Sequence, residues 1–322
     1  MIRRFPVSIA LLALSSTAFA ASERTWSPLV RGYLPAGDSQ GATATSRGTI
    51  ALGPESKELA SPPSPYLWAL ALKDGHVFAA SGDGGEIWSV PDDGSAAKVL
   101  YDATEPQAQA LGLWKGDLVA AFNPGGRVVR LIGDKPEVVF KAPTEAYVWA
   151  ILPGAKDGSL HVAVGSPGRV YRVEPGTPAK VELDSGDGAV RALAYAKDGK
   201  LLAGTDGRGL LERVDGEGHR FVLFDAPRRE ISSISVAPDG TIWFAAIGQE
   251  EPEVATTPAT PADPKKGPPG LLYRMRPDGF AELIWTAPGP SITAVLAGAS
   301  SVLVATGDPG AVWRIDGESV SR

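Results

Sequence analysis

Short apolar strands separated by polar turns make up most of this chain, and one strand recurs. The stretch GRVYRVEPG, residues 168–176, opens on a glycine, alternates apolar with charged residues and ends in a turn. Such alternation predicts a half-buried β-strand. Copies of the strand open at six glycines: Gly85, Gly126, Gly168, Gly209, Gly270 and Gly310. No stretch shows a sustained period of 3.6 residues, so we expect an all-β protein with almost no helix.

The spacing of these glycines predicts a repeat architecture. Four of the five intervals are 40 to 42 residues long, and the fifth is 61. A four-stranded propeller blade takes about 40–45 residues. The extra residues fall in segment 249–268, QEEPEVATTPATPADPKKGP. Because this segment is rich in Pro, Thr and charged residues, we expect a flexible loop inserted in one blade.

One repeat, residues 147–188, divides into four strands. They are YVWAILPGAKDG, SLHVAVGSPG, GRVYRVEPG and KVELDSG, and the first ends in Asp-Gly, which favours a tight hairpin turn. A single blade cannot bury both of its faces, so blades must stack. We therefore expect the aromatic residue of the third strand to pack between neighbouring blades, at Trp88, Tyr171, Tyr273 and Trp313.

The repeats predict a β-propeller of six four-stranded blades in a single domain, residues 43–322, with seven blades as the alternative. Five repeats are complete between residues 66 and 290, whereas the last, 291–322, shows three strands. We expect segment 43–60 to supply the missing strand and close the ring; in the seven-blade alternative it starts a further blade. Residues 21–42 are an N-terminal extension.

Residues 1–20 have the pattern of a signal peptide. Arg3 and Arg4 precede a short apolar stretch, residues 5–14, and Ala18-Phe19-Ala20 fits a small-residue cleavage site. The apolar stretch is shorter than the about 20 residues that span a bilayer. We expect an exported mature chain, periplasmic or secreted, without a membrane span after cleavage.

Composition excludes some partners and chemistries. The chain has no cysteine, which excludes disulfides and thiolate metal sites. Its formal net charge of −6 becomes −8 after removal of residues 1–20, which carry two arginines and no acid. An acidic chain argues against nucleic acid or an anionic membrane as the main partner.

The repeated pattern Asp-Gly, β-rich strand, Gly-x-apolar-[Trp/Tyr]-Arg resembles that of secreted bacterial β-propeller proteins of the WD-like and YVTN-like repeat type. The resemblance covers residues 43–317, while the Gly-His and Trp-Asp signature of eukaryotic WD repeats is absent. Such families include interaction platforms, periplasmic assembly factors and a few lactonases and lyases, so the resemblance implies a fold and leaves the function open.

Equivalent positions at the start of each first strand form the candidate binding site. Aromatic pairs Tyr66/Trp68 and Tyr147/Trp149 stand two repeats apart, and Arg191 and Glu230 occupy equivalent positions in later repeats. At the mouth of a propeller channel they would form an aromatic rim with charged groups, which is typical of binding hot spots. The alternative is that both tryptophans plug the channel or pack between blades.

The sequence therefore favours a non-enzymatic platform that binds a protein or polymer partner in the cell envelope. A purely structural envelope component is a further hypothesis. The enzymatic alternative is a metal-assisted hydrolase or lyase of the gluconolactonase-like or lyase-like propeller class. We assign no catalytic residue, metal ligand or cofactor. Resemblance to lactonase propellers leaves open a divalent cation such as calcium, held by Glu230 with Glu145 and Asp187 nearby.

Overall fold

A computed structural model describes residues 42–46, 50–53, 57–133, 135–154, 157–215, 218–249, 267–307, 310–317 and 319–322. Residues 1–41, with the expected signal peptide and most of the extension, lie outside the described residues, as do residues 250–266 of the expected insert. Apart from one 3-10 turn, η1 (Pro143–Glu145), the described elements are all β-strands. None of the described helical structure is long and apolar enough to cross a membrane.

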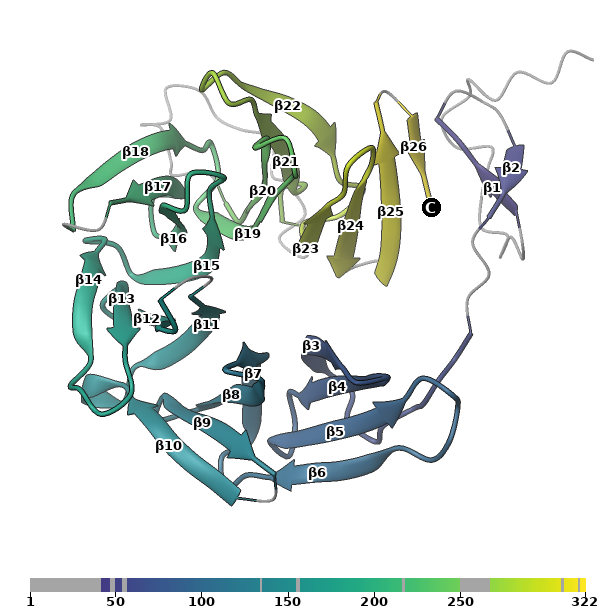
Figure 1. Cartoon of the computed structure of the whole chain (residues 1–322). Coiled ribbons are helices and arrows are strands. Elements are labelled where there is room, and N and C mark those ends of the chain that lie inside the picture. Colours follow the sequence, from purple (N-terminus) through teal and green to yellow (C-terminus); the bar gives the residue numbers. More distant parts are fainter. Residues whose placement is uncertain are drawn as a thin grey trace, which may run out of the picture. The chain divides into compact units, whose positions relative to one another are not determined.

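Strands β3 to β26 pair in antiparallel groups of four consecutive members, and we call the six groups sheets 1 to 6 (Figure 1). Sheets 3, 4 and 5 are also joined to one another through the single residue pairs Gly165–Ala189 and Asp206–Glu230. Sheet 1 contains β3 (Leu67–Lys73), β4 (His76–Ser81), β5 (Glu86–Pro91) and β6 (Lys98–Asp102). Sheet 2 contains β7 (Gln107–Trp114), β8 (Asp117–Asn123), β9 (Arg127–Ile132) and β10 (Lys135–Lys141). Sheet 3 contains β11 (Tyr147–Pro153), β12 (Leu160–Gly165), β13 (Arg169–Val173) and β14 (Lys180–Asp184).

The remaining sheets repeat this order. Sheet 4 contains β15 (Ala189–Tyr195), β16 (Leu201–Asp206), β17 (Leu210–Val214) and β18 (Arg220–Asp225). Sheet 5 contains β19 (Glu230–Val236), β20 (Ile242–Ile247), β21 (Leu271–Met275) and β22 (Ala281–Thr286). Sheet 6 contains β23 (Ile292–Ala297), β24 (Val302–Gly307), β25 (Gly310–Asp316) and β26 (Ser319–Ser321). From sheet 1 to sheet 6, the first strand of each sheet contacts the first strand of the next.

The strand division predicted for residues 147–188 is confirmed in β11 to β14, and the insert leaves sheet 5 between β20 and β21. The recurrent glycine also has the expected role, because each copy stands just before the third strand of its sheet or is that strand's first residue. At Gly209, φ is +67°, and an added Cβ would collide with the carbonyl oxygen of Arg228. A side chain there would suffer both backbone strain and overlap, so this turn requires glycine.

Five apolar cores lie between the sheets, one at each junction of consecutive sheets from 1–2 to 5–6. The second strand of a sheet such as β12 is buried at every position, since both of its faces pack against a neighbour. The fourth strand is the most exposed in sheets such as 4. A continuous apolar run in the second strand is what burial on both faces requires.

The expected position of the third-strand aromatics is confirmed in three sheets. Tyr171 packs against Phe140 of sheet 2, with ring centroids 5.2 Å apart. Tyr273 packs against Phe224 of sheet 4 at 4.9 Å, and Trp313 against Trp285 of sheet 5 at 5.4 Å. Trp88 of sheet 1 is half-buried instead, and its indole N–H donates to Glu86 at 2.9 Å.

The prediction for the last repeat is wrong. Sheet 6 obtains its fourth strand from the C-terminus, because Gly317, with φ +57°, allows the chain to turn back so that β26 pairs with β25. The N-terminal strands β1 (Ala42–Ala44) and β2 (Ile50–Leu52) pair with each other. The described residues of segment 43–60 meet sheet 6 at its outer strand, where Thr45 bridges Ser321 and the N–H of Ser46 donates to the Val320 carbonyl.

Candidate functional site

A β-bulge occurs near the start of the first strand in every sheet. The register against the second strand shifts by one residue at the same place, between Leu67 and Ala69 in β3 and between Val148 and Ala150 in β11. The extra residues, which we call the bulge residues, are Trp68, Gln109, Trp149, Arg191, Ser232 and Thr293. A bulge leaves one residue out of the ladder and redirects its side chain, and bulges are frequent beside functional sites.

Four of the predicted site residues form one continuous group, which we call the Arg191 cluster. The Tyr147 and Trp149 rings of β11 stack with centroids 5.5 Å apart. The guanidinium carbon of Arg191, on β15, lies 3.7 Å from the centroid of Trp149. Its Nε donates to Oε1 of Glu230, the first residue of β19, at 2.9 Å. The cluster therefore joins the first strands of sheets 3, 4 and 5.

Burial strengthens the Arg191–Glu230 contact. The exposed fractions of the two side chains are 25% and 15%. A guanidinium stacked on an indole and held by a carboxylate loses most of its rotational freedom, and partial removal from water strengthens both interactions. Tyr147 remains on the surface. The group is thus rigid on its buried side and accessible on the other.

The other predicted pair, Tyr66 and Trp68, forms a second exposed aromatic surface on sheet 1. The two rings are nearly parallel, at 6°, with centroids 5.7 Å apart. Trp68 is 48% exposed, so it neither fills a core nor packs between sheets. Gly82 lies directly beneath its indole, and an added Cβ at this position would overlap the ring. A glycine at position 82 leaves the space that the Trp68 indole occupies next to the end of β4.

The remaining bulge residues are polar. The hydroxyl of Ser232 donates to the Ile292 carbonyl at 2.8 Å, and that of Thr293 to the Ala305 carbonyl at 3.3 Å. Gln109 on β7 is half-buried. None of the six bulge residues is aliphatic, although the strands that carry them are largely apolar.

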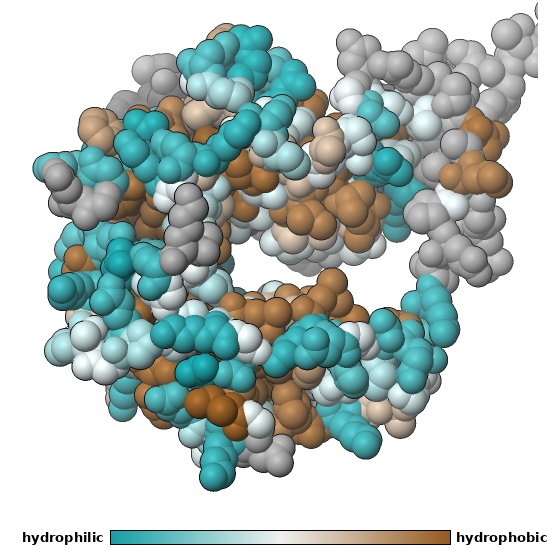
Figure 2. Space-filling view, viewed as in Figure 1, coloured by the Kyte–Doolittle hydropathy of each residue, from teal (hydrophilic) through white to brown (hydrophobic). Residues whose placement is uncertain are grey.

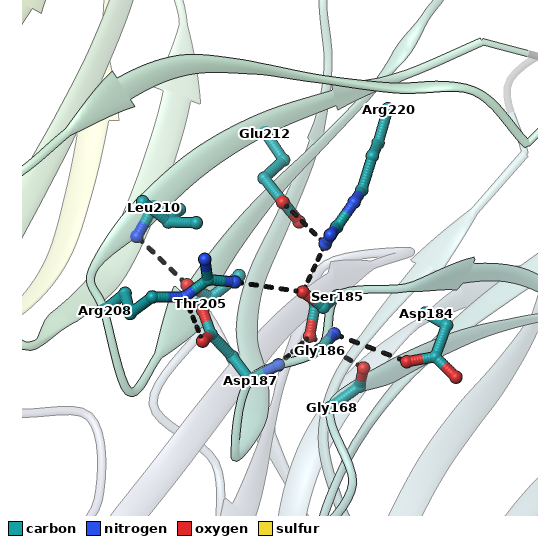
Figure 3. A network of polar contacts seen from close by, with 10 residues as sticks. All are labelled: Gly168, Asp184, Ser185, Gly186, Asp187, Thr205, Arg208, Leu210, Glu212 and Arg220. Atoms are coloured by element: carbon teal, nitrogen blue, oxygen red, sulfur yellow. Dashed lines mark hydrogen bonds and ion pairs between the residues drawn. The ribbon is translucent and has the colours of Figure 1, made fainter.

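A second polar group lies at the junction of sheets 3 and 4, and we call it the Ser185 network (Figure 3). The Ser185 carbonyl accepts from both Arg208 and Arg220. Arg208 also donates to Asp187 at 2.8 Å, and Arg220 to Glu212 at 3.2 Å. One oxygen of each carboxylate, Asp187 Oδ2 and Glu212 Oε2, is buried without a hydrogen-bond partner.

Glu212 occupies the place that an aromatic residue holds in other sheets. Like Tyr171 and Tyr273, it is the third residue after the strand-opening glycine, and its side chain is fully buried. Desolvation by burial raises the pKa of Glu212; Arg220 opposes this shift, and the negative charge of Asp187 adds to it. Alignment of the repeats reveals this substitution, although Glu212 is not among the site residues predicted from the sequence.

The same junction holds the buried His161. Its Nδ1 lies 2.7 Å from the Tyr195 hydroxyl, and its Nε2 lies 2.7 Å from Glu182 Oε2. Burial, together with the nearby carboxylates of Asp157 and Glu182, raises the pKa of Tyr195 to about 12. The hydroxyl therefore stays protonated at neutral pH and can donate to the imidazole.

The residues considered for a divalent cation lie apart in different contacts. Glu230 pairs with Arg191, and Asp187 pairs with Arg208. The side chain of Glu145 lies outside what the structure describes. In the described part of the chain, no group of three or more His, Asp or Glu side chains has an arrangement that could hold a metal ion.

Comparison with solved structures identifies the architecture. A catalytically inactive variant of virginiamycin B lyase from Staphylococcus aureus, with quinupristin, has a TM-score of 0.64 and 14% identity, covering 80% of this chain and 83% of that one. The WD40 β-propeller domain of Doa1 has a TM-score of 0.59 and 14% identity, covering 80% and 78%. The fold is a β-propeller.

A gluconolactonase from Xanthomonas campestris is a further structural neighbour, with a TM-score of 0.55, 14% identity, and coverage of 79% of this chain and 86% of that one. No protein-family model matches the chain, and no curated protein matches its sequence. Since propellers of this similarity include both enzymes and a WD40 domain, function has to be argued from the site.

The raised pKa of Glu212 predicts a stability effect of known sign. A carboxyl that binds its proton more tightly in the folded state makes unfolding easier as pH rises. Between about pH 4 and 7, the free energy of unfolding of Glu212→Gln should therefore rise relative to that of the wild type. Urea unfolding across this range measures the difference. The matched control is Glu137→Gln, whose carboxylate is exposed; a pH-independent difference for Glu212→Gln would contradict the account.

Proposed function

We propose that this propeller is a non-enzymatic binding platform whose partner, a protein or a polymer of the cell envelope, docks on the bulge residues of the first strands. The observation that carries the proposal is the Arg191 cluster. Aromatic, guanidinium and carboxylate groups from sheets 3, 4 and 5 meet there in direct contact. Trp, Tyr and Arg are the residues that contribute most to binding energy at interfaces.

The preorganisation of these groups supports binding as their role. Stacking on Trp149 and the bond to Glu230 already hold Arg191 in place. Tyr66 and Trp68 present a second stacked pair. Ordering long side chains in advance lowers the entropic cost of association, which is a general route to affinity.

An alanine variant of the aromatic pairs tests this function. Wild-type protein should enrich a partner from envelope extract. The partner should be lost when both stacking surfaces are removed in the quadruple variant Tyr66→Ala/Trp68→Ala/Tyr147→Ala/Trp149→Ala. The matched control is Phe221→Ala/Phe280→Ala, which removes exposed aromatic rings from elsewhere on the surface.

Circular dichroism and thermal melting establish that each variant is folded. A partner retained by the folded quadruple variant would overturn the proposal. Turnover of a lactone or glycan that a chelator abolishes would instead favour the metal-assisted hydrolase or lyase.

We also propose that the six sheets are the six blades of a closed ring, in which sheet 6 packs against sheet 1. Two apolar faces support this. Leu70 and Leu72 on β3 are 63% and 73% exposed, and Leu296 and Val312 on sheet 6 are 64% and 59% exposed. Figure 2 shows hydrophobic surface over β3 and over β23. At the five described junctions, such faces form the cores.

Because the chain has no cysteine, crosslinking can test ring closure directly. In the double variant Leu70→Cys/Leu296→Cys, a short bifunctional maleimide should join the two thiols within one molecule, seen as a monomer with altered mobility on denaturing gels. The control Leu70→Cys/Phe221→Cys places the second thiol on the outer strand of sheet 4 and should not close within a monomer. Crosslinking only between molecules would indicate that the two faces pair across two chains.

The pattern of residues 1–20 supports export to the periplasm or beyond. We expect the mature chain, recovered from a cell that exports it, to begin at Ala21, and N-terminal sequencing measures this. An intact N-terminus in the exported fraction would contradict cleavage after residue 20.

A further inference from the structure

Arg191 has an unused end. Only its Nε is engaged, by Glu230, while its guanidinium carbon lies 3.7 Å from the centre of the Trp149 ring. Its two terminal nitrogens make no hydrogen bond to the described residues, and the side chain is partly exposed. Arg127 differs, since it donates to both oxygens of Glu105, at 2.7 and 2.6 Å. Arg191 therefore presents a fixed fork of N–H donors to solvent, which matches the two oxygens of a carboxylate.

The bulge residues, of which Trp149 lies against this fork, have the chemistry of a site for hydroxylated rings. Two are indoles, two carry hydroxyls, one carries an amide and one is Arg191 itself; none is aliphatic. Flat aromatic faces accept the apolar side of a sugar ring, whereas amide and hydroxyl groups pair with its hydroxyls.

The acidic net charge of the protein gives no long-range attraction for an anionic ligand. A formal net charge of −6 repels polyanions at long range, so binding of an anionic polymer has to come from local contacts. Arg191 supplies that fit, because the carboxylate of Glu230 engages Nε and leaves the terminal nitrogens available.

We propose that the Arg191 cluster binds a carboxylate-bearing sugar unit, a uronic acid, within an acidic polysaccharide. The Arg191 fork holds the carboxylate, and the exposed ring of Tyr147 stacks against a sugar face, while Trp149 supports both groups from below. This inference rests on the proposed binding function and specifies the ligand class of the same site.

Calorimetric titration with three probes of matched length tests the ligand class: oligogalacturonate, neutral cello-oligosaccharide and an oligo-aspartate peptide. A chelator in the buffer prevents calcium from bridging carboxylates. Wild-type protein should bind the oligogalacturonate at least about tenfold more tightly than either other probe. Arg191→Lys keeps the charge but loses the fork, and should weaken this binding about tenfold.

The matched control is Arg276→Lys. Arg276 also lies over an aromatic ring, 4.8 Å from the centroid of Phe280, and pairs with Asp278 at 3.3 Å, but it stands at the β21–β22 turn. Oligogalacturonate affinity should be unchanged in this variant. Equal loss in both lysine variants would overturn the assignment to Arg191.

The outcomes separate this inference from the proposed function. Tighter binding of the peptide, or equal binding of neutral and acidic sugars, overturns the uronic-acid assignment while the site remains a binding site. If no probe binds but the aromatic quadruple variant still loses the envelope partner, only the ligand class is overturned. If no probe binds and the quadruple variant retains the partner, both the ligand class and the proposed function are overturned.

Discussion

Apolar packing of each sheet against the sheets before and after it is the interaction on which this fold depends. A four-stranded sheet of this size cannot bury both faces alone, and the second strands, such as β12, are buried throughout. Small residues and β-branched residues in these strands let neighbouring sheets approach. The same requirement applies to the apolar faces of sheets 1 and 6, which are exposed among the described residues and which we propose to pack against each other.

This packing fixes most residues and leaves one position in each sheet free to vary. Next to the bulge in β11, Val148 belongs to the core between sheets 2 and 3, and Ala150 packs against the core between sheets 3 and 4. The extra residue between them, Trp149, joins neither core. The equivalent residue can therefore be Trp, Gln, Arg, Ser or Thr without cost to the fold. A repeat built for stacking thus leaves this set of side chains outside the cores, available for the binding role that we propose.

Periodicity and glycine spacing predicted the strand order, the insert position and the four residues that meet in the Arg191 cluster, because all of these follow from one repeated unit. The fourth strand of sheet 6 was missed, although Asp316-Gly317 is the same turn signal that closes other hairpins. Contacts between sheets, such as Arg191 over Trp149, could not be predicted, since they depend on how far each bulge turns its side chain.

The Ser185 network connects the packing of sheets 3 and 4 to the Arg191 cluster. Asp187 lies on the loop that leads into β15, the strand that carries Arg191. Its backbone N–H donates to the Ser185 hydroxyl, and its carboxylate accepts from Arg208. Burying Glu212 beside this loop destabilises the junction relative to an aromatic residue, but the polar contacts fix the start of β15. We infer that these contacts help to hold the start of β15, and with it the Arg191 guanidinium over Trp149, so that the polar junction supports the Arg191 cluster.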